Sequence, residues 1–264
     1  MDQPAAIILA AGKGTRMPGD LPKVVHDVAG APMVRWVADA CLDAGCSFVS
    51  VVVGYKQELV RSIFEKDAEH GFVRFCVQDE QLGTGHATQA AAEHFEGFDG
   101  PVLLLAGDGP LVRFQTLARL IELHGASGAA ATLATTTIDD PTGYGRIVRG
   151  ADGRFARIVE QKNATPEELA IREVNPSIWC FDAKALFRTL RKVRRNETTG
   201  EYYVTDVPAL MLEEGLRVEI MDGVPAEEAL SVNTPAQREE VEAILLSRLG
   251  AGSGAARIDG ERGA

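Results

Sequence analysis

Residues 5–17 read A-A-I-I-L-A-A-G-K-G-T-R-M. The first part of this stretch is a short continuous apolar run, which predicts a strand buried on both faces of a parallel sheet. The strand leads directly into a turn that contains Gly12 and Gly14. Such a turn lets backbone N–H groups approach an anion closely, and Lys13 and Arg16 add positive charge. Two glycines can also simply turn the chain, so a phosphate-binding interpretation needs support from elsewhere in the sequence.

The glycine-rich turn differs from two common phosphate-binding loops. A P-loop requires the pattern G-x-x-x-x-G-K-[ST], which is absent from the sequence. A dinucleotide-binding turn requires G-x-G-x-x-G, and Met17 stands where its third glycine would be. The sequence therefore excludes both of these motifs.

Apolar strand-like runs alternate with helical periods from residue 5 to residue 136. Strands are expected at residues 5–10, 48–53, 73–77, 101–106 and 129–136, and helices at residues 33–44, 57–70, 87–95 and 116–124. This alternation predicts an α/β fold of Rossmann-like type, in which a mostly parallel sheet is flanked by helices on both faces.

The alternation changes after residue 139. Residues 146–149 and 154–159 flank Ala151-Asp152-Gly153, which predicts a β-hairpin. After the hairpin we expect a strand at residues 174–181, helices at 183–192 and 205–214, and a strand at 218–222. Because no linker rich in Pro, Ser or Gly intervenes, residues 1–233 are expected to form one domain with a small β-rich extension. A C-terminal helix at 234–249 and a disordered tail at 250–264 complete the expected organisation.

Composition places the chain among globular proteins. Hydrophobic residues make up 45% of its 264 residues. The chain has 27 basic and 38 acidic side chains, which give a net charge of −11 and a pI of about 5.0. This acidity excludes the basic surface of a typical nucleic-acid-binding domain. The 4 cysteines form no C-x-x-C pair, which argues against a zinc site or a disulfide framework. The sequence shows no signal peptide and no apolar run of about 18 residues, so we expect a cytoplasmic protein without a membrane segment.

The glycine-rich turn is one of a series of motifs, and Leu21-Pro22-Lys23 follows it closely. Further motifs are Q-x-x-Q-L-G-T-G-H-A at 78–87, G-D-x-P-L at 107–111, D-P-T-G-Y-G-R-I at 140–147, I-V-E at 158–160, E-V-N at 173–175, G-E-Y-Y-V-T-D at 200–206 and V-N at 232–233. In this order they resemble the sugar-nucleotide pyrophosphorylases, most of all the pyrophosphorylase domain of the bacterial N-acetylglucosamine-1-phosphate uridyltransferases. The resemblance extends as far as Arg248 and implies the nucleotide-diphospho-sugar transferase fold, with the β-rich extension binding the sugar.

The resemblance implies a reaction that needs no general base. A phosphate oxygen of N-acetyl-α-D-glucosamine 1-phosphate attacks the α-phosphate of UTP, pyrophosphate leaves in line, and UDP-N-acetylglucosamine results. Because the nucleophile is already an anion, the lack of a Ser-His-Asp or Cys-His constellation is no obstacle. The barrier is mainly charge repulsion, which positioning, cations and Mg²⁺ reduce.

The resemblance assigns the phosphate chemistry to a small set of side chains. Lys23 would neutralise the α-phosphate, and Arg16 would hold the departing β- and γ-phosphates with its forked guanidinium. Asp108 follows the strand at 101–106, at the edge of the sheet where ligands bind, and together with Asn233 it would hold Mg²⁺. From the residues alone, a solvated lysine, a turn aspartate and a helix-capping asparagine stay open as alternatives.

The same resemblance assigns residues to base and sugar recognition. The nucleotide side comprises Ala11, Gly12, Gly14, Gln78, Gly83 and Thr84. The sugar side comprises Gly145, Glu160, Asn175, Tyr203 and Thr205. The amide of Gln78 can both donate and accept, as the edge of uracil requires. From the residues alone, a solvated Gln78, an exposed Glu160 and a core Tyr203 stay open as alternatives.

Some positions depart from the family pattern. Asn175 is followed by Pro176-Ser177, where the family has a small residue and then glycine, and Ala106 stands where some relatives carry a larger residue. Asn233 is followed by Thr234-Pro235 in place of a second asparagine and an arginine. These changes concern the sugar, so a UDP-glucose or dTDP-sugar pyrophosphorylase is an alternative. A non-catalytic nucleotide-sensing domain is another. The β-helix that carries acetyl transfer and trimer formation in the bifunctional enzymes has no counterpart in this sequence, so neither property is expected of it.

Overall fold

The computed structural model describes residues 2–251. Within them, a seven-stranded sheet has the order β13-β7-β12-β6-β1-β4-β5. Its strands are β1 (Ala5–Leu9), β4 (Val49–Val53), β5 (Val73–Val77), β6 (Pro101–Ala106), β7 (Ala131–Ala134), β12 (Ile178–Asp182) and β13 (Val218–Met221). Strand β12 runs antiparallel to both of its neighbours, and the other pairings are parallel. The prediction of a mostly parallel sheet is confirmed.

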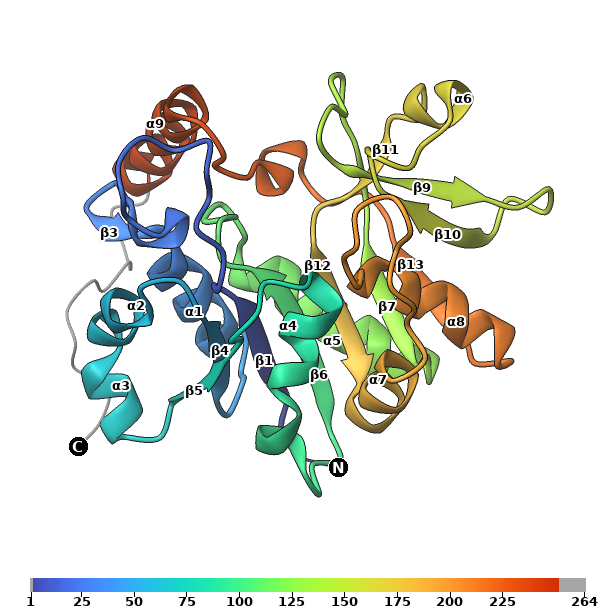
Figure 1. Ribbon diagram of the computed structural model, residues 1–264, viewed down its shortest axis with the longest axis horizontal. Helices are drawn as coiled ribbons and strands as arrows, with labels where there is room; N and C mark the ends of the chain where they lie inside the picture. Colours follow the sequence, from blue (N-terminus) through green and yellow to red (C-terminus); the bar gives the residue numbers. More distant parts are fainter. Residues whose placement is uncertain (1, 252–264) are drawn as a thin grey trace.

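Helices cover both faces of this main sheet (Figure 1). One face carries α1 (Met33–Asp43) and α5 (Phe114–Ser127), and the other carries α4 (Thr84–Ala90), α7 (Ala183–Leu190) and α8 (Val207–Glu213). Ala6 and Ile8 of β1 belong to the core under α1 and α5, whereas Ala5 and Ile7 belong to the core on the opposite face. Successive side chains of a strand point to opposite faces, so a strand covered on both sides has to be apolar throughout.

Some helical segments are shorter than the sequence pattern predicts. The single helix expected at residues 57–70 is two helices, α2 (Gln57–Ile63) and α3 (Glu65–Glu69), because the chain leaves helical geometry at the buried Phe64. The helix expected at 87–95 begins earlier, as α4, and ends in a 3₁₀ turn at Ala92–Phe95. Likewise, α8 is preceded by a 3₁₀ turn at Val204–Asp206.

A second sheet packs beyond β7 and β12, at the upper right of Figure 1. Its order is β10-β9-β11-β8, with β8 (Thr136–Thr137), β9 (Gly145–Arg149), β10 (Phe155–Val159) and β11 (Glu173–Asn175). Strands β9 and β10 pair antiparallel, so the predicted hairpin is confirmed. A short helix, α6 (Pro166–Leu169), follows the hairpin and is capped by Thr165. This sheet is the β-rich extension that the sequence predicts.

The single strand expected at residues 174–181 is in fact two strands of different sheets, β11 and β12. Pro176 and Ser177 lie between them, and Ser177 has a φ of +59°, a left-handed conformation that ends the extended run. Similarly, the run at 129–136 leaves the main sheet after β7 and enters the second sheet at β8. An apolar run predicts an extended segment. It does not predict which sheet the segment joins, because strands of both sheets bury apolar side chains.

Helix α9 (Pro235–Ala251) packs against the short hairpin of β2 (Asp27–Val28) and β3 (Ala31–Pro32). Its side of the contact includes Val241 and Leu245, which belong to a third apolar core. This packing places the start of α9, and therefore the residues just before it, beside the N-terminal third of the chain.

The C-terminal helix expected at residues 234–249 is α9, which begins one residue later and ends two residues further along the chain. Gly250 and Ala251, which we expected in the disordered tail, belong to the helix. The rest of that tail, residues 252–264, lies outside the described residues.

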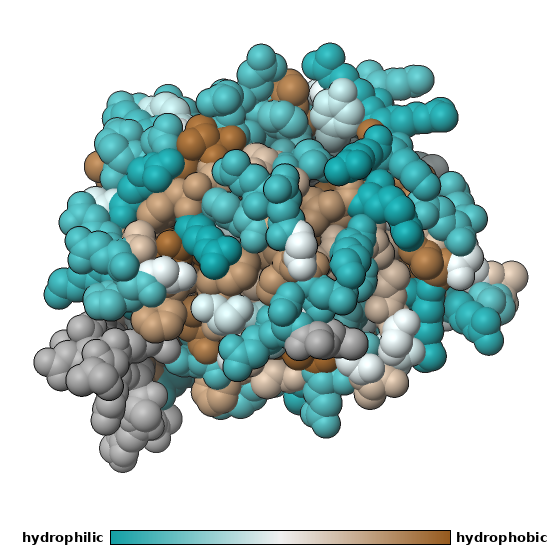
Figure 2. Space-filling view, turned by 90° about the horizontal axis from the view of Figure 1, so that it is seen from below, coloured by the Kyte–Doolittle hydropathy of each residue, from teal (hydrophilic) through white to brown (hydrophobic). Residues whose placement is uncertain are grey.

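Few large apolar side chains of the described chain are exposed. These are Leu21, Val77, Phe114, Leu169 and Leu246. Figure 2 shows one face on which apolar residues form small patches among polar ones. The cysteines Cys41, Cys46, Cys76 and Cys180 are buried and unbridged. Within residues 2–251, no helix has the length and apolarity to cross a membrane.

Candidate active site

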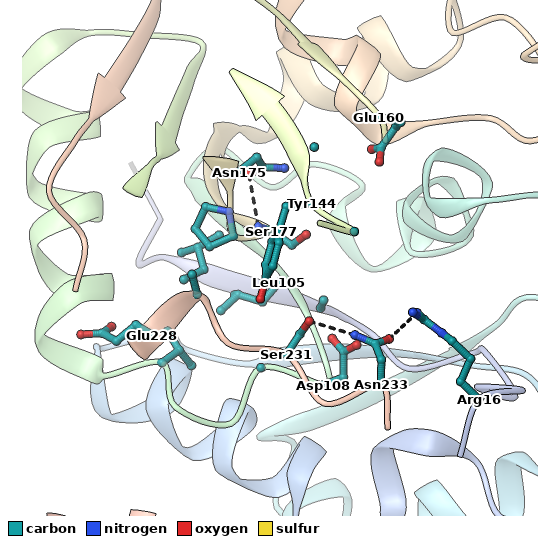
Figure 3. Close-up of a pocket in the computed structure, with 18 residues that line it drawn as sticks. Arg16, Leu105, Asp108, Tyr144, Glu160, Asn175, Ser177, Glu228, Ser231 and Asn233 are labelled. Carbon is teal, nitrogen blue, oxygen red and sulfur yellow. Dashed lines mark hydrogen bonds between the residues drawn. The ribbon is translucent and has the colours of Figure 1, made fainter. Parts of the chain in front are cut away.

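Two cavities meet at the end of β6. The glycine-loop cavity is lined by, among others, Ala11, Gly12, Gly14, Lys23, Gln78, Gly83, Thr84 and Trp179. The second-sheet cavity, drawn in Figure 3, is lined by, among others, Arg16, Tyr144, Gly145, Glu160, Asn175, Glu228, Ser231 and Asn233. Ala106, Asp108 and Ser177 line both cavities. We call the place where these three residues lie the junction.

The glycine-rich turn packs tightly against Lys23. Gly14 has a φ of +72°, and a Cβ there would lie 2.4 Å from the Cβ of Lys23, so only glycine fits. The Lys23 N–H also donates to the carbonyl of Lys13 at 3.2 Å. At Gly12, by contrast, a Cβ would meet no atom of the described chain within 4 Å. Gly14 therefore serves to position Lys23, whereas packing does not demand a glycine at residue 12.

Polar side chains from distant parts of the chain converge at the junction. The Lys23 ammonium donates to the Asp108 carboxylate and, at 2.8 Å, to Oδ1 of Asn233. The Arg16 guanidinium donates to the same Asn233 oxygen at 2.8 Å (Figure 3). Asp108 lies just beyond β6 and is 9% exposed. The fold thus brings together the side chains that were predicted to act on phosphates and metal.

Asn233 is held in place by its neighbours in the chain. Its N–H donates to Oε1 of Gln237 at 2.8 Å, and its Nδ2 donates to the hydroxyl of Ser231 at 3.1 Å. The start of α9 is capped by Thr234, whose hydroxyl accepts from the Gln237 N–H at 3.3 Å. Thr234, and not Asn233, therefore caps the helix, and the side-chain Oδ1 of Asn233 faces Lys23.

The oxygens of Asp108 and Asn233 are suited to a divalent cation. They already converge on one positive charge, the Lys23 ammonium. A carboxylate and an amide oxygen are hard donors of the kind that Mg²⁺ takes, with water and phosphate oxygens completing its shell. Within residues 2–251, no group of three or more His, Cys, Asp or Glu side chains is arranged to hold a metal. A cation at the junction would therefore take its further ligands from water or from a substrate.

The residues predicted to recognise the base are clamped by the segment around Tyr202. The buried Gln78 donates from Nε2 to the carbonyl of Gly83 at 3.1 Å, so it is not a solvated loop residue. Gly83 has a φ of +102°, and a Cβ there would lie 2.6 Å from the carbonyl oxygen of Tyr202. The Thr84 hydroxyl accepts from the N–H of Val204 at 3.1 Å. These contacts fix both the turn and the glutamine amide at the wall of the glycine-loop cavity.

On the sugar side, Gly145, Glu160 and Asn175 line the second-sheet cavity together. The Glu160 carboxylate accepts from the hydroxyl of Thr205 at 2.8 Å. Burial raises the pKa of Glu160 above its ordinary value, and the Thr205 hydrogen bond opposes that shift. Oδ1 of Asn175 accepts from the N–H of Ser177 at 3.2 Å. Glu160 is thus a half-buried carboxylate on the cavity wall and not the exposed acid of the alternative.

Tyr203 and Thr205 were also predicted on the sugar side, but in the described chain they line neither cavity. Tyr203 is buried, and its hydroxyl donates to that of Thr199 at 2.8 Å, which fits the core alternative. Thr205 contacts Glu160 and orients it. Tyr203 and Thr205 therefore support the walls of the site from behind, whereas Glu201 of the same motif lines the glycine-loop cavity.

Several residues of the second-sheet cavity escaped prediction, among them Tyr144 and Ser231. Burial raises the pKa of Tyr144, and a hydrogen bond with Ser231 opposes that shift. Tyr144 lies within the motif at 140–147, from which it could have been found. Ser231 carries no comparable sequence signal, because folding alone brings it beside Tyr144.

Glu228 also lines the second-sheet cavity, but its carboxylate points to α5. It accepts from the N–H of Arg113 at 3.1 Å and from the hydroxyl of Thr116 at 2.9 Å. A negative charge at the start of a helix is favourable. Glu228 therefore stabilises this wall, and the contacts leave it no ligand-binding role.

Comparison with known proteins gives a consistent result. A family model described as the MobA-like NTP transferase domain matches residues 6–202. The bifunctional protein GlmU of Geobacter metallireducens is 49% identical over 236 residues, which cover 89% of this chain and 49% of that protein. The bifunctional protein GlmU of Clostridium acetobutylicum is 43% identical over 244 residues, which cover 92% of this chain and 52% of that protein. The chain thus spans about half the length of these curated relatives.

Solved structures share the fold at low sequence identity. A putative glucose-1-phosphate thymidylyltransferase from Bacillus anthracis has a TM-score of 0.76 at 18% identity, covering 91% of this chain and 94% of that one. A UDP-glucose pyrophosphorylase complexed with UDP-glucose has a TM-score of 0.74 at 14% identity, covering 92% and 98%. The predicted nucleotidyltransferase fold is therefore confirmed.

Proposed function

This chain belongs to the family of MobA-like NTP transferase domains, and we propose that it is a uridyltransferase. The proposed reaction converts UTP and N-acetyl-α-D-glucosamine 1-phosphate to UDP-N-acetylglucosamine and pyrophosphate. The motif series and the identity to the GlmU proteins support it. The observation that carries it is the convergence of Arg16, Lys23, Asp108 and Asn233 where two cavities join.

The two cavities suit the two substrates. In the glycine-loop cavity, backbone at Ala11 and Gly12 and the fixed amide of Gln78 offer the contacts that a triphosphate and a uracil need. In the second-sheet cavity, the Glu160 carboxylate can accept from sugar hydroxyls, and Asn175 can contact a hydroxyl or an acetamido group. The reacting phosphates would then meet at the junction.

In the proposed mechanism the chain binds and orients anions and exchanges no protons. The acceptor oxygen forms a bond to the α-phosphorus, and the bond from that phosphorus to the pyrophosphate oxygen breaks. Lys23 lies at the junction, where it can neutralise the charge that develops on the α-phosphate. The resemblance assigns Arg16 to the departing phosphates, but its guanidinium lies on the second-sheet side. Its position favours a contact with the acceptor phosphate.

Asp108 and Asn233 would hold the divalent cation, for which we propose Mg²⁺. When bound, such a cation neutralises charge on phosphate oxygens. The Lys23 ammonium bridges these same two oxygens in the structure. An ammonium has three N–H donors, so Lys23 keeps one for a phosphate while the other two hold these oxygens.

The test is pyrophosphate release by the purified protein with UTP, Mg²⁺ and N-acetylglucosamine 1-phosphate. We expect release with this pair and loss of release with EDTA. In Lys23→Met, which removes the ammonium group but keeps a side chain of similar size, kcat should fall by about 100-fold or more. Lys66→Met, at an exposed lysine of α3, is the matched control and should keep the wild-type rate.

The same assay contains the outcomes that would contradict the proposal. Release with glucose 1-phosphate alone, or with dTTP alone, would assign the alternative acceptor or base. The departures at Ala106 and Ser177, both at the junction, make the acceptor the point to examine. Silence with every pair would assign the non-catalytic alternative.

A further inference from the structure

Ser177 adopts a backbone conformation that is costly for a serine and easy for a glycine. Its φ of +59° lies in the left-handed region. Within residues 2–251, the other non-glycine residues with positive φ are Ala29 and Lys56. Ala29 lies in the turn between β2 and β3, Lys56 directly precedes α2, and neither lines the two cavities described above. Among these three residues, Ser177 is the one at the candidate active site.

The fold needs the turn at residue 177, but it does not need a serine side chain there. Strand β11 belongs to the second sheet and β12 to the main sheet, so the chain changes direction between Asn175 and Ile178. Glycine would make this turn with less strain. A residue held in a sparsely populated conformation at a binding site points to a use for its side chain.

Ser177 lies where the two cavities join. Ile178 of β12 pairs with Leu105 of β6, which places Ser177 beside Ala106 at the ends of the two strands. The N–H of Ser177 donates to Oδ1 of Asn175 (Figure 3). The backbone of Ser177, not its hydroxyl, therefore makes the bond that holds Asn175.

The chemistry of the junction singles out this hydroxyl. The residues that line both cavities are Ala106, Asp108 and Ser177. Ala106 has no polar side-chain atom, and the Asp108 carboxylate repels a phosphate. The Ser177 hydroxyl is a rotatable donor that can turn toward a phosphate oxygen.

We propose that the Ser177 hydroxyl binds the phosphate of the sugar 1-phosphate, where its attacking oxygen faces the α-phosphate. The inference rests on the proposed function. The positive charges of Lys23 and Arg16 lie close to the junction, because both side chains donate to Oδ1 of Asn233. Ser177 supplies a neutral donor from the turn before β12, so it orients the acceptor without adding charge.

Ser177→Ala and Ser177→Gly separate the hydroxyl from the backbone. Both variants lose the hydroxyl, but only glycine relaxes the left-handed conformation. We expect both to raise the KM for the sugar 1-phosphate by about tenfold, the effect of losing one hydrogen bond to a charged group, and to leave the KM for UTP unchanged. Ser177→Gly should melt about 2 °C or more above Ser177→Ala, because it removes the strain.

Ala29→Gly is the control for strain away from the cavities. It relaxes a positive φ at a residue that lines neither of them, so its KM values for both substrates should be those of wild type. A wild-type acceptor KM in Ser177→Ala would overturn the inference. A rise in the KM for both substrates would also overturn it, since that result indicates general distortion of the junction.

Failure of the inference and failure of the proposed function give different results. If wild type turns over N-acetylglucosamine 1-phosphate and Ser177→Ala matches it, only the role of Ser177 is wrong. If wild type uses only another sugar 1-phosphate, the acceptor in the proposed function is wrong, and the same KM comparison with that acceptor decides the role of Ser177. Silence of wild type with every pair overturns both.

Discussion

Lys23 and Asp108 form an ion pair whose side chains are only 18% and 13% exposed. A charge removed from water in this way is tolerated because its partner and further hydrogen bonds compensate it. Asn233 provides such a bond to Lys23, and the tight approach of Gly14 keeps the lysine in place. At the scale of single residues, the chemistry of the site therefore depends on the glycine-rich turn.

Alanine substitutions in this turn should have different effects at its two glycines. Gly14→Ala places a Cβ against Lys23 at a positive φ, so we expect a loss of about 1–3 kcal/mol in the free energy of unfolding and a large fall in kcat. Gly12→Ala should change the free energy of unfolding by less than about 0.5 kcal/mol but raise the KM for UTP, because its methyl group enters the glycine-loop cavity. Urea denaturation and initial rates measure both effects. Equal destabilisation by the two variants would contradict this account.

The pKa of Glu160 predicts a pH dependence of acceptor binding. Burial raises this pKa, so the carboxylate takes up its proton at a higher pH in the folded protein than in the unfolded chain. The folded state is then favoured at low pH, and this contribution to stability is lost as the pH rises through the folded pKa. The ionised carboxylate, which accepts from sugar hydroxyls in the proposed function, is lost as the pH falls. The KM for the sugar 1-phosphate should therefore increase as the pH falls from about 8 to about 5.

Glu160→Gln separates this titration from that of the substrate. The variant keeps the titration of the sugar phosphate itself, which every enzyme form experiences. At neutral pH, the KM of Glu160→Gln for the sugar 1-phosphate should be higher than that of wild type. This KM should also change less with pH than the wild-type value. Identical pH profiles for the two proteins would show that Glu160 does not contact the acceptor.

At the scale of elements, helix α9 connects the stability of the fold to the site. Asn233 directly precedes its first turn and bonds to Gln237 within it. The helix is anchored by Val241 and Leu245, which pack on the core that includes Val28 and Met33. A loosened α9 would release Asn233 from the junction.

Two neighbouring leucines of α9 test this connection. Leu245 is 5% exposed, so Leu245→Ala should lower the free energy of unfolding by about 2–4 kcal/mol, through a cavity in the third core. Leu246 is 55% exposed, and Leu246→Ala should change it by less than about 0.5 kcal/mol. Thermal and urea denaturation give the comparison. A similar loss in both variants would mean that α9 is not anchored as described.

At the scale of the whole molecule, the site exists because two sheets meet. The main sheet and the glycine-rich turn form the glycine-loop cavity, whereas Gly145, Glu160 and Asn175 of the second-sheet cavity lie in or beside the smaller sheet. The chain passes between the sheets after β7 and again at Pro176-Ser177. In the proposed function, each substrate would therefore bind to its own structural unit.

Amide hydrogen exchange should distinguish these units. UTP with Mg²⁺ should slow exchange at residues 12–16 and 78–86, and the sugar 1-phosphate at residues 143–146 and 175–178. The reason is that ligand contacts stabilise the backbone locally, and exchange reports local opening. Mass spectrometry of peptides from each region measures the effect. Protection of residues 78–86 by the sugar phosphate alone would contradict the assignment of the cavities.

Local sequence patterns are enough to predict the elements whose signal spans a few residues. The run at 5–10 had to be a doubly buried strand because it is apolar at every position, and β1 is such a strand. The hairpin of β9 and β10 follows from the turn at Ala151-Asp152-Gly153. The motif series likewise singles out Lys23 and Asp108, whose side chains are in contact in the fold. Periodicity and turn chemistry act over a few residues, so they can be read without the fold.

Which of these residues are in contact depends on the packing of the whole chain. Arg16 and Asn233 are separated by 217 positions, and their hydrogen bond depends on how α9 packs on the β2–β3 hairpin. The division of residues 174–181 between two sheets, and with it the left-handed Ser177, is also invisible to periodicity. A local pattern records whether a side chain is buried. It does not record against which distant partner, because that depends on the packing of the whole chain.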